Sequence, residues 1–103
     1  MANNPKAKYQ VLDVPFEAVG AHVRNAALSS AVTLTCPAGA NTLRISVETQ
    51  AVRVRFDGTA PTATTGIVWA AGETRDEPVS PGQAIQVIEA TASAVINYQW
   101  GLR

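Results

Sequence analysis

Apolar and polar side chains alternate with a period of two along most of this chain, which is typical of β-strands with one buried face. The clearest case is 42–48, where Leu43, Ile45 and Val47 fall on one face and polar side chains on the other. From residue 31 onward we predict six or more short strands separated by turn residues. The predicted strands are 31–36, 42–48, 52–56, 66–72, 84–90 and 94–102.

The links between these stretches predict how the strands connect. A short polar link joins 42–48 to 52–56, so we expect an antiparallel hairpin. A similar link at 91–93 predicts that 84–90 and 94–102 form a final strand pair. The polar, proline-containing stretch 74–83 is predicted to be a loop.

The last stretch carries apolar side chains on both faces. Ile96, Tyr98 and Trp100 fall on one face, and Val95 falls on the other together with two polar residues. A strand of this kind is expected to be central or covered on both sides.

These patterns predict an all-β fold, either an antiparallel β-sandwich or a small jelly-roll-like barrel. Residues 17–28 could form one helical turn, but Gly20 interrupts them. We predict that residues 1–20 form a flexible, extended N-terminal arm and that 21–103 form a single β-sandwich domain. An arm of this kind is expected to add a strand to a neighbouring subunit or to wrap around it.

Composition narrows the possible partners. The chain has 103 residues, enough for one domain, and 47% of them are hydrophobic. Eight basic and eight acidic side chains cancel, so there is no electrostatic reason to expect nucleic acid or an anionic membrane as the main partner. A neutral chain has little charge repulsion between its copies, which suits a protein that is part of an assembly. No signal-like or membrane-spanning apolar run occurs, so we expect synthesis and folding in a cytoplasm.

The residues that usually carry catalysis are scarce. Cys36 is the single cysteine and ends an apolar alternation, so we predict a small buried side chain rather than a nucleophile. His22, the single histidine, lies 14 positions away, and neither a metal-ligand spacing nor a serine-nucleophile motif is present. We therefore predict a non-enzymatic protein without a metal or cofactor.

Three arginines form the most suggestive polar set. Arg53 and Arg55 fall on the outward face of 52–56, and Arg44 is expected across the predicted hairpin. Such a face could hold an acidic partner surface, or the arginines could pair with carboxylates of the same chain. Trp69 and Trp100 lack interleaved basic residues, so a place in the core or at a subunit interface is favoured over stacking on nucleic-acid bases.

The stretch "DGTAPT" predicts a rigid corner after the strand 52–56. Asp57 and the glycine that follows it favour a turn, and Pro61 fixes its own backbone φ. Thr59 and the later threonines can hydrogen-bond the local backbone. We interpret this corner as a contact surface and not as an active site.

A longer pattern runs through the second half of the chain. The stretch "VRVRF" leads into Asp-Gly-Thr-Ala-Pro-Thr, and Gly66, Gly72 and Glu73 follow. A strand over Ile85–Glu89 and the aromatic pair Tyr98 and Trp100 complete the pattern. In this pattern, residues 31–102 resemble small virion structural proteins of tailed bacteriophages, of the capsid decoration (cement) type.

The resemblance implies a protein that binds the major capsid protein shell at the virion surface, as a homodimer or homotrimer, after synthesis in the bacterial host cytoplasm. Alternatives are a head or tail accessory subunit, a virion module that binds host carbohydrate through an exposed tryptophan, and a cellular enzyme or nucleic-acid module that uses the arginine face. The candidate contact residues are Arg44, Arg53, Arg55, Asp57, Thr59, Pro61, Trp69 and Trp100.

Overall fold

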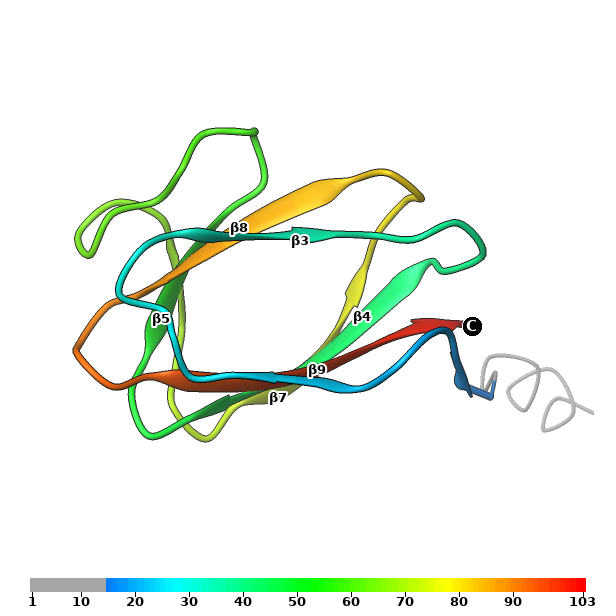
Figure 1. The fold of residues 1–103 in the computed structure, drawn as a ribbon, viewed down its shortest axis with the longest axis horizontal. Helices are drawn as coiled ribbons and strands as arrows, with labels where there is room; N and C mark the ends of the chain where they lie inside the picture. The colour runs from blue at the N-terminus through cyan, green and yellow to red at the C-terminus, as the bar shows by residue number, and fades with distance from the viewer. Residues whose placement is uncertain (1–14) are drawn as a thin grey trace, which may run out of the picture.

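Two antiparallel β-sheets stack face to face in the computed structural model, which describes residues 15–103 (Figure 1). The described residues contain no helix. The prediction of an all-β sandwich is confirmed. In place of the helical turn considered over 17–28, two short strands run beside the last strand of the chain.

The strands of the first sheet are β1 (Glu17–Ala18), β2 (Val23–Asn25), β4 (Thr42–Glu48), β7 (Thr74–Pro78) and β9 (Val95–Leu102). Those of the second are β3 (Val32–Thr35), β5 (Val52–Arg55), β6 (Ile67–Trp69) and β8 (Ala84–Glu89). The first sheet has the order β1-β9-β4-β7, and β2 also pairs with β9. The second sheet has the order β3-β8-β5-β6.

The central position predicted for the last strand is confirmed. β9 pairs with β4 on one side and with β1 and β2 on the other. One face of β9 packs into the core through Ile96 and Trp100. On the other face Gly101 is covered by the ring of Phe16, close enough that a Cβ on this glycine would lie 2.2 Å from the ring.

Both predicted hairpins are wrong. β4 and β5 lie in different sheets, and so do β8 and β9. The short links between them cross from one sheet to the other, and the two crossings are tied together where the hydroxyl of Thr49 donates to the carbonyl of Ser93. The inward side chains of a strand face the same core whether the next strand lies beside it in the sheet or in the opposite sheet, so alternation could not distinguish the two arrangements.

The loop predicted over 74–83 is also wrong in its first half. Residues 74–78 form β7, which pairs with β4 so that Asp76 lies opposite Arg44. The stretch is polar on both faces because β7 is an edge strand, and charged side chains and proline are common on such edges. Only 79–83 form the connection to β8.

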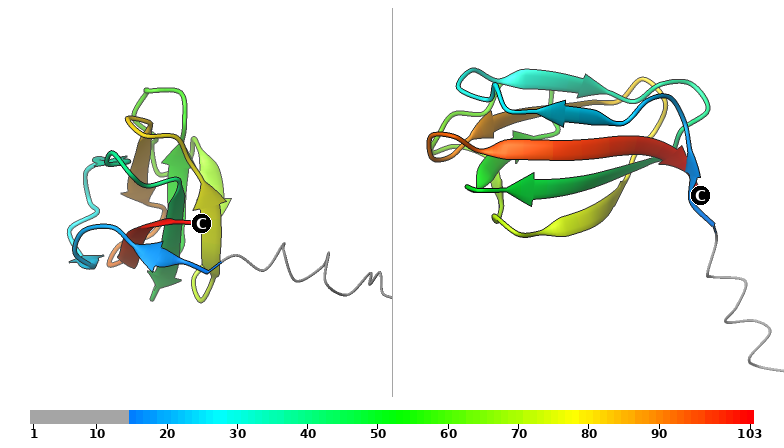
Figure 2. Two further views of the ribbon diagram at one scale, coloured as in Figure 1. Left: turned by 90° about the vertical axis from the view of Figure 1, so that its right-hand side faces the viewer. Right: turned by 60° about the horizontal axis from the view of Figure 1, so that its bottom comes forward.

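The first described residues belong to the sandwich. β1 pairs with the end of β9, with Glu17 opposite Leu102, and Figure 2 shows the start of the described chain beside the C-terminal end. Sheet pairing therefore begins within the predicted arm of residues 1–20. The remainder of that arm, residues 1–14, lies outside the described residues.

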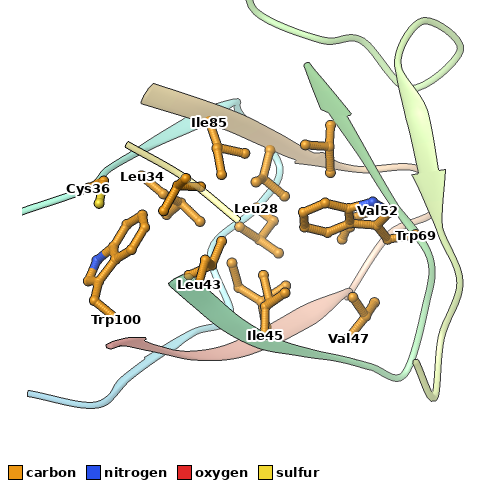
Figure 3. Packing of buried hydrophobic residues seen from close by; sticks show 14 of the residues in the cluster. Leu28, Leu34, Cys36, Leu43, Ile45, Val47, Val52, Trp69, Ile85 and Trp100 are labelled. Carbon is orange, nitrogen blue, oxygen red and sulfur yellow. The ribbon is translucent and has the colours of Figure 1, made fainter. Parts of the chain in front are cut away.

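The inward side chains of both sheets form one continuous apolar core (Figure 3). Trp69 lies at one end of it, and Trp100 lies at the other beside Cys36. Cys36 is buried as predicted, its Sγ donates to the carbonyl of Ala40 at 3.4 Å, and burial raises the pKa of its thiol. His22 is on the surface next to Asn97, so the structure does not bring the cysteine and the histidine together.

We predict that nuclear Overhauser contacts in solution will connect β4 with β9 and with β7. The backbone protons of Ile45 should contact those of Tyr98 on one side and Arg75 on the other, because these residues are opposite each other in the two ladders. Backbone contacts between β4 and β5 would instead show that these strands form a hairpin, and would contradict this fold.

Candidate protein-contact surfaces

The predicted corner is a self-bracing loop, residues 56–66, between β5 and β6. The guanidinium of Arg55 donates two hydrogen bonds to the carboxylate of Asp57, which also accepts one from the backbone N–H of Thr59. These donors, with Arg55 first, hold the pKa of the Asp57 carboxyl below its ordinary value. The side-chain amide of Gln86 on β8 donates to the carbonyl of Gly58 at 3.1 Å. The first half of the corner is thereby fastened to the second sheet.

The second half of the corner is held by its threonines. The hydroxyl of Thr62 accepts hydrogen bonds from the backbone N–H groups of Thr64 and Thr65, at 3.3 and 3.0 Å. Pro61 is buried inside the loop, whereas Thr59 is exposed. Of the predicted contact residues in this loop, Asp57 and Thr59 are therefore presented to solvent, and Pro61 supports the loop from within.

A shallow pocket of about 260 Å³ lies between the two stems of the corner. Its lining is mainly apolar and includes Val54, Phe56 and Ile67, with the Arg55–Asp57 ion pair beside them. The ring of Phe56 packs at a tilt against Trp69, with 6.2 Å between the ring centroids. The pocket floor is therefore continuous with the core through Phe56.

Next to the pocket, β6 exposes two large apolar side chains. Ile67 is 56% exposed and Val68 is 48% exposed. Within residues 15–103, β6 pairs with β5 alone, so its other edge lies open. Sequence analysis missed this surface, although the signal was present: the run "GIVWAA" has no polar alternation that would mark a solvent-facing side. We call Ile67, Val68 and the adjoining pocket the β6 patch.

The face of three arginines expected from the sequence does not form. Arg44 lies on the outer face of the first sheet, whereas Arg53 and Arg55 lie on β5 in the second. The expectation was wrong because it depended on the β4–β5 hairpin. Each arginine also has a partner within the chain: Arg44 pairs with Asp76, Arg55 pairs with Asp57, and Arg53 donates to the carbonyl of Gly66 at 3.0 Å.

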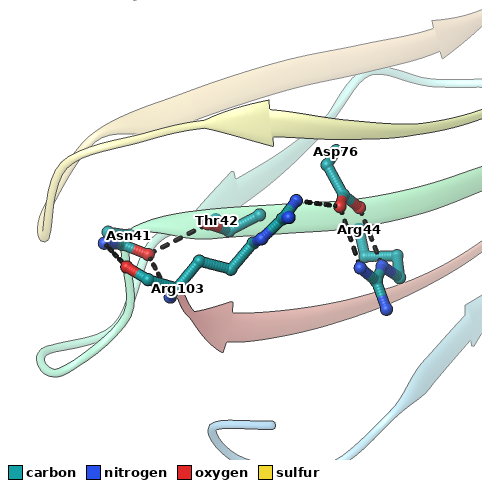
Figure 4. A network of polar contacts seen from close by, with 5 residues as sticks. All are labelled: Asn41, Thr42, Arg44, Asp76 and Arg103. Atoms are coloured by element: carbon teal, nitrogen blue, oxygen red, sulfur yellow. Dashed lines mark hydrogen bonds and ion pairs between the residues drawn. The ribbon is translucent and has the colours of Figure 1, made fainter. Parts of the chain in front are cut away.

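Arg44 belongs to a polar network on the outer face of the first sheet (Figure 4). Two of its nitrogens donate to the carboxylate of Asp76, at 2.8 and 2.9 Å, and Arg103 donates to the same carboxylate at 2.8 Å. Hydrogen bonding by Arg44 lowers the pKa of Asp76, and the charges of both arginines lower it further against the opposing effect of partial burial. The side chain of Asn41 both donates to and accepts from the backbone of Arg103. This network joins β4, β7 and the end of the chain.

The same face holds the start of the described chain. The ring of Phe16 lies against Gly101 and beneath the guanidinium of Arg44, which is 4.0 Å from the ring centroid. Since Arg44 is itself fixed by Asp76, the point at which residues 1–14 join the sandwich is held in place on this face.

Both tryptophans are core residues. Trp69 is 1% exposed and lies under the guanidinium of Arg75, which is 4.6 Å from its ring centroid. Trp100 is 8% exposed and packs edge-on against Tyr98. Neither ring forms a surface platform, so the structure favours the core over a subunit interface for both.

Residues 15–103 contain no group of three or more histidine, cysteine or carboxylate side chains placed to hold a metal ion. Across the same residues, no helix has the length and apolar character needed to span a membrane. Comparison of the chain with protein-family models, with curated proteins and with solved structures finds no match. The surfaces themselves are therefore the basis for assigning a function.

We predict that Gly66→Ala will destabilise the fold more than Gly39→Ala. Both glycines have positive φ, but a Cβ at Gly66 would lie 3.1–3.2 Å from β5 atoms, whereas one at Gly39 would have nothing within 4 Å. Backbone strain alone should cost about 1–2 kcal/mol at Gly39, and strain with displacement of β5 about 2–3 kcal/mol at Gly66. Urea unfolding of the two variants measures the difference, and equal losses would contradict the close packing at the base of the corner.

We predict that acid unfolding will depend on Asp76. Its pKa is lowered in the folded state, so its stabilising contribution is complete above the unfolded pKa of about 3.9 and is lost as the pH falls through the lower folded value. Urea unfolding between pH 7 and pH 2 should therefore show a shallower loss of stability for Asp76→Asn than for the original chain. Asp57→Asn is the matched control and should change the profile less, because the Asp57 side chain is 56% exposed and that of Asp76 is 25% exposed. An unchanged profile for Asp76→Asn would contradict the role of the network.

Proposed function

We propose that this protein is a non-enzymatic structural subunit of a tailed-phage virion, and specifically a capsid decoration protein that binds the assembled head. One observation carries the proposal: a self-braced polar corner lies directly beside an exposed apolar edge strand. A subunit that contacts both a shell and copies of itself needs two surfaces of different chemistry, and one small sandwich presents both here.

The corner is suited to contact with a preassembled surface. It is fixed by hydrogen bonds within the chain, so little conformational entropy is lost when it is buried in an interface. Its exposed groups, Asp57 and Thr59 among them, are polar and hydrogen-bonding, as is common at the rim of protein interfaces. We assign the shell contact to this corner.

The competing functions have weaker support. A nucleic-acid site was motivated by a face of three arginines, and these are divided between two sheets and engaged by partners within the chain. A carbohydrate platform was motivated by an exposed tryptophan, and both tryptophans are buried. Neither alternative retains the observation that suggested it.

We predict that the protein will co-sediment with assembled heads of the phage that encodes it, but not with free coat subunits. Thr59→Arg should weaken head binding at least tenfold, because the new side chain projects from the corner, and each tenfold loss corresponds to about 1.4 kcal/mol. Thr33→Arg, on the exposed face of β3 in the same sheet, is the matched control and should bind as the original chain does.

The outcomes of this experiment separate the possible roles. Failure of the original chain to bind heads would overturn the decoration role. Tight binding to unassembled coat subunits would identify a scaffold or chaperone instead. An equal loss of head binding in Thr59→Arg and Thr33→Arg would show that the corner is not the contact surface.

A further inference from the structure

The open edge of β6 is chemically unlike the edge of β7, which lies on the same side of the sandwich. β7 carries Arg75, Glu77 and Pro78, and charges and proline of this kind discourage pairing with another chain. β6 consists of Ile67, Val68 and Trp69, with neither charge nor proline. Within residues 15–103 it is thus an unprotected edge, and it lies beside an apolar pocket.

The size of this edge limits what can bind there. β6 has three residues, which is too few for two rigid copies to bury the roughly 1,200–2,000 Å² typical of a stable interface by edge-to-edge pairing. An extended peptide suits it better, because its main chain can pair with the edge while one side chain enters the pocket. If the peptide is attached to a subunit of the same assembly, reciprocal binding raises its effective concentration.

The chain contains such a peptide outside the described residues. Residues 9–14 read "YQVLDV", in which Leu12 and Val14 would fall on one side of an extended strand and Tyr9 and Val11 on the other. The segment lacks glycine and proline, and Pro15 favours an extended conformation for the residue before it.

Charge also matches this segment to the sandwich. Residues 1–14 hold two lysines, Lys6 and Lys8, and one aspartate, which gives a net charge of +1. The whole chain is neutral, so residues 15–103 carry −1. These opposite net charges favour contact between the segment of one copy and the sandwich of another.

The fixed position of Phe16 indicates which copy supplies the segment. Phe16 is held on the outer face of the first sheet, against Gly101 and Arg44, whereas β6 belongs to the second sheet. To reach its own β6, the preceding chain would have to bend around the edge of β7 directly after leaving this face. Val14 is only two positions before Phe16 and stays within about 7 Å of it, so a bound segment 9–14 requires a β6 edge packed close to this face, which a neighbouring copy can supply.

We propose that residues 9–14 of one copy add as a strand to the open edge of β6 in a neighbouring copy and place an apolar side chain in the pocket beside it. This inference rests on the proposed function in that the chain acts as one of several copies. It goes beyond that function by naming both the segment and the surface that join them.

The test uses two full-length variants and light scattering across a range of concentrations. Val68→Asp places a charge on the edge, and Leu12→Asp with Val14→Asp places charges on the segment. The original chain should show at least twice the monomer mass, and each variant alone should show the monomer mass. Thr33→Asp, on the exposed face of β3, is the control and should behave as the original chain does. Circular dichroism verifies that every variant is folded.

Mixing the two variants identifies the source of the segment. The edge variant keeps an intact segment and the segment variant keeps an intact edge, so an equal mixture should regain a species of two copies. A mixture that stays monomeric would overturn the proposal and indicate that the segment binds within its own chain or elsewhere. A monomeric original chain, or an edge variant that keeps its full mass, would also overturn it.

The result is independent of head binding. If the chain binds heads but remains monomeric, only the proposed exchange of segments is contradicted. If the chain exchanges segments but does not bind heads, only the proposed decoration role is contradicted.

Discussion

Burial of two apolar sheet faces against each other is the interaction on which the rest of this structure depends. The inward residues of β4 and β9 on one side and of β5 and β8 on the other leave the side chains of Leu43, Ile45, Val52 and Val87 at most 1% exposed. To build this core the chain passes twice from sheet to sheet through short links, and the hydrogen bond from Thr49 to Ser93 joins the two links. Strands that follow each other closely in the sequence are therefore separated across the core, and each pairs with a strand distant in the sequence.

The sandwich leaves open edges, and their chemistry differs. β7 is covered with charge: Arg75 lies over Trp69 while it pairs with Glu73 and Glu77, and Asp76 fastens the outer face to Arg44 and Arg103. β6 has none of these features and exposes Ile67 and Val68. The apolar pocket lies between the two stems of the self-braced corner beside it. The proposed contacts with a shell and with neighbouring copies both arise from this one side of the second sheet.

Much of the fold could be predicted from the sequence, and less of the candidate site. Alternation located the strands of the core, the central position of β9 and the burial of Cys36, because a period of two reports directly which side chains face inward. It failed for β7, whose side chains are polar on both faces, and for both hairpins. The site prediction failed where it depended on those hairpins: Arg44 was placed beside Arg53 and Arg55 and lies on the opposite sheet. The corner was predicted more fully, since turns formed by aspartate, glycine, proline and threonine depend on neighbouring residues alone.

The sequence by itself determined the fold class, the rigid corner and the lack of a disulfide within the chain, because each depends on residue type and on spacing along the chain. The tertiary structure decided which strands pair, which arginines have carboxylate partners, and that Ile67 and Val68 remain exposed while Trp69 beside them is buried. The physical reason is that an apolar stripe specifies burial but not the partner that buries it. That partner follows from the crossing of the links between sheets, which brings together residues far apart in the sequence.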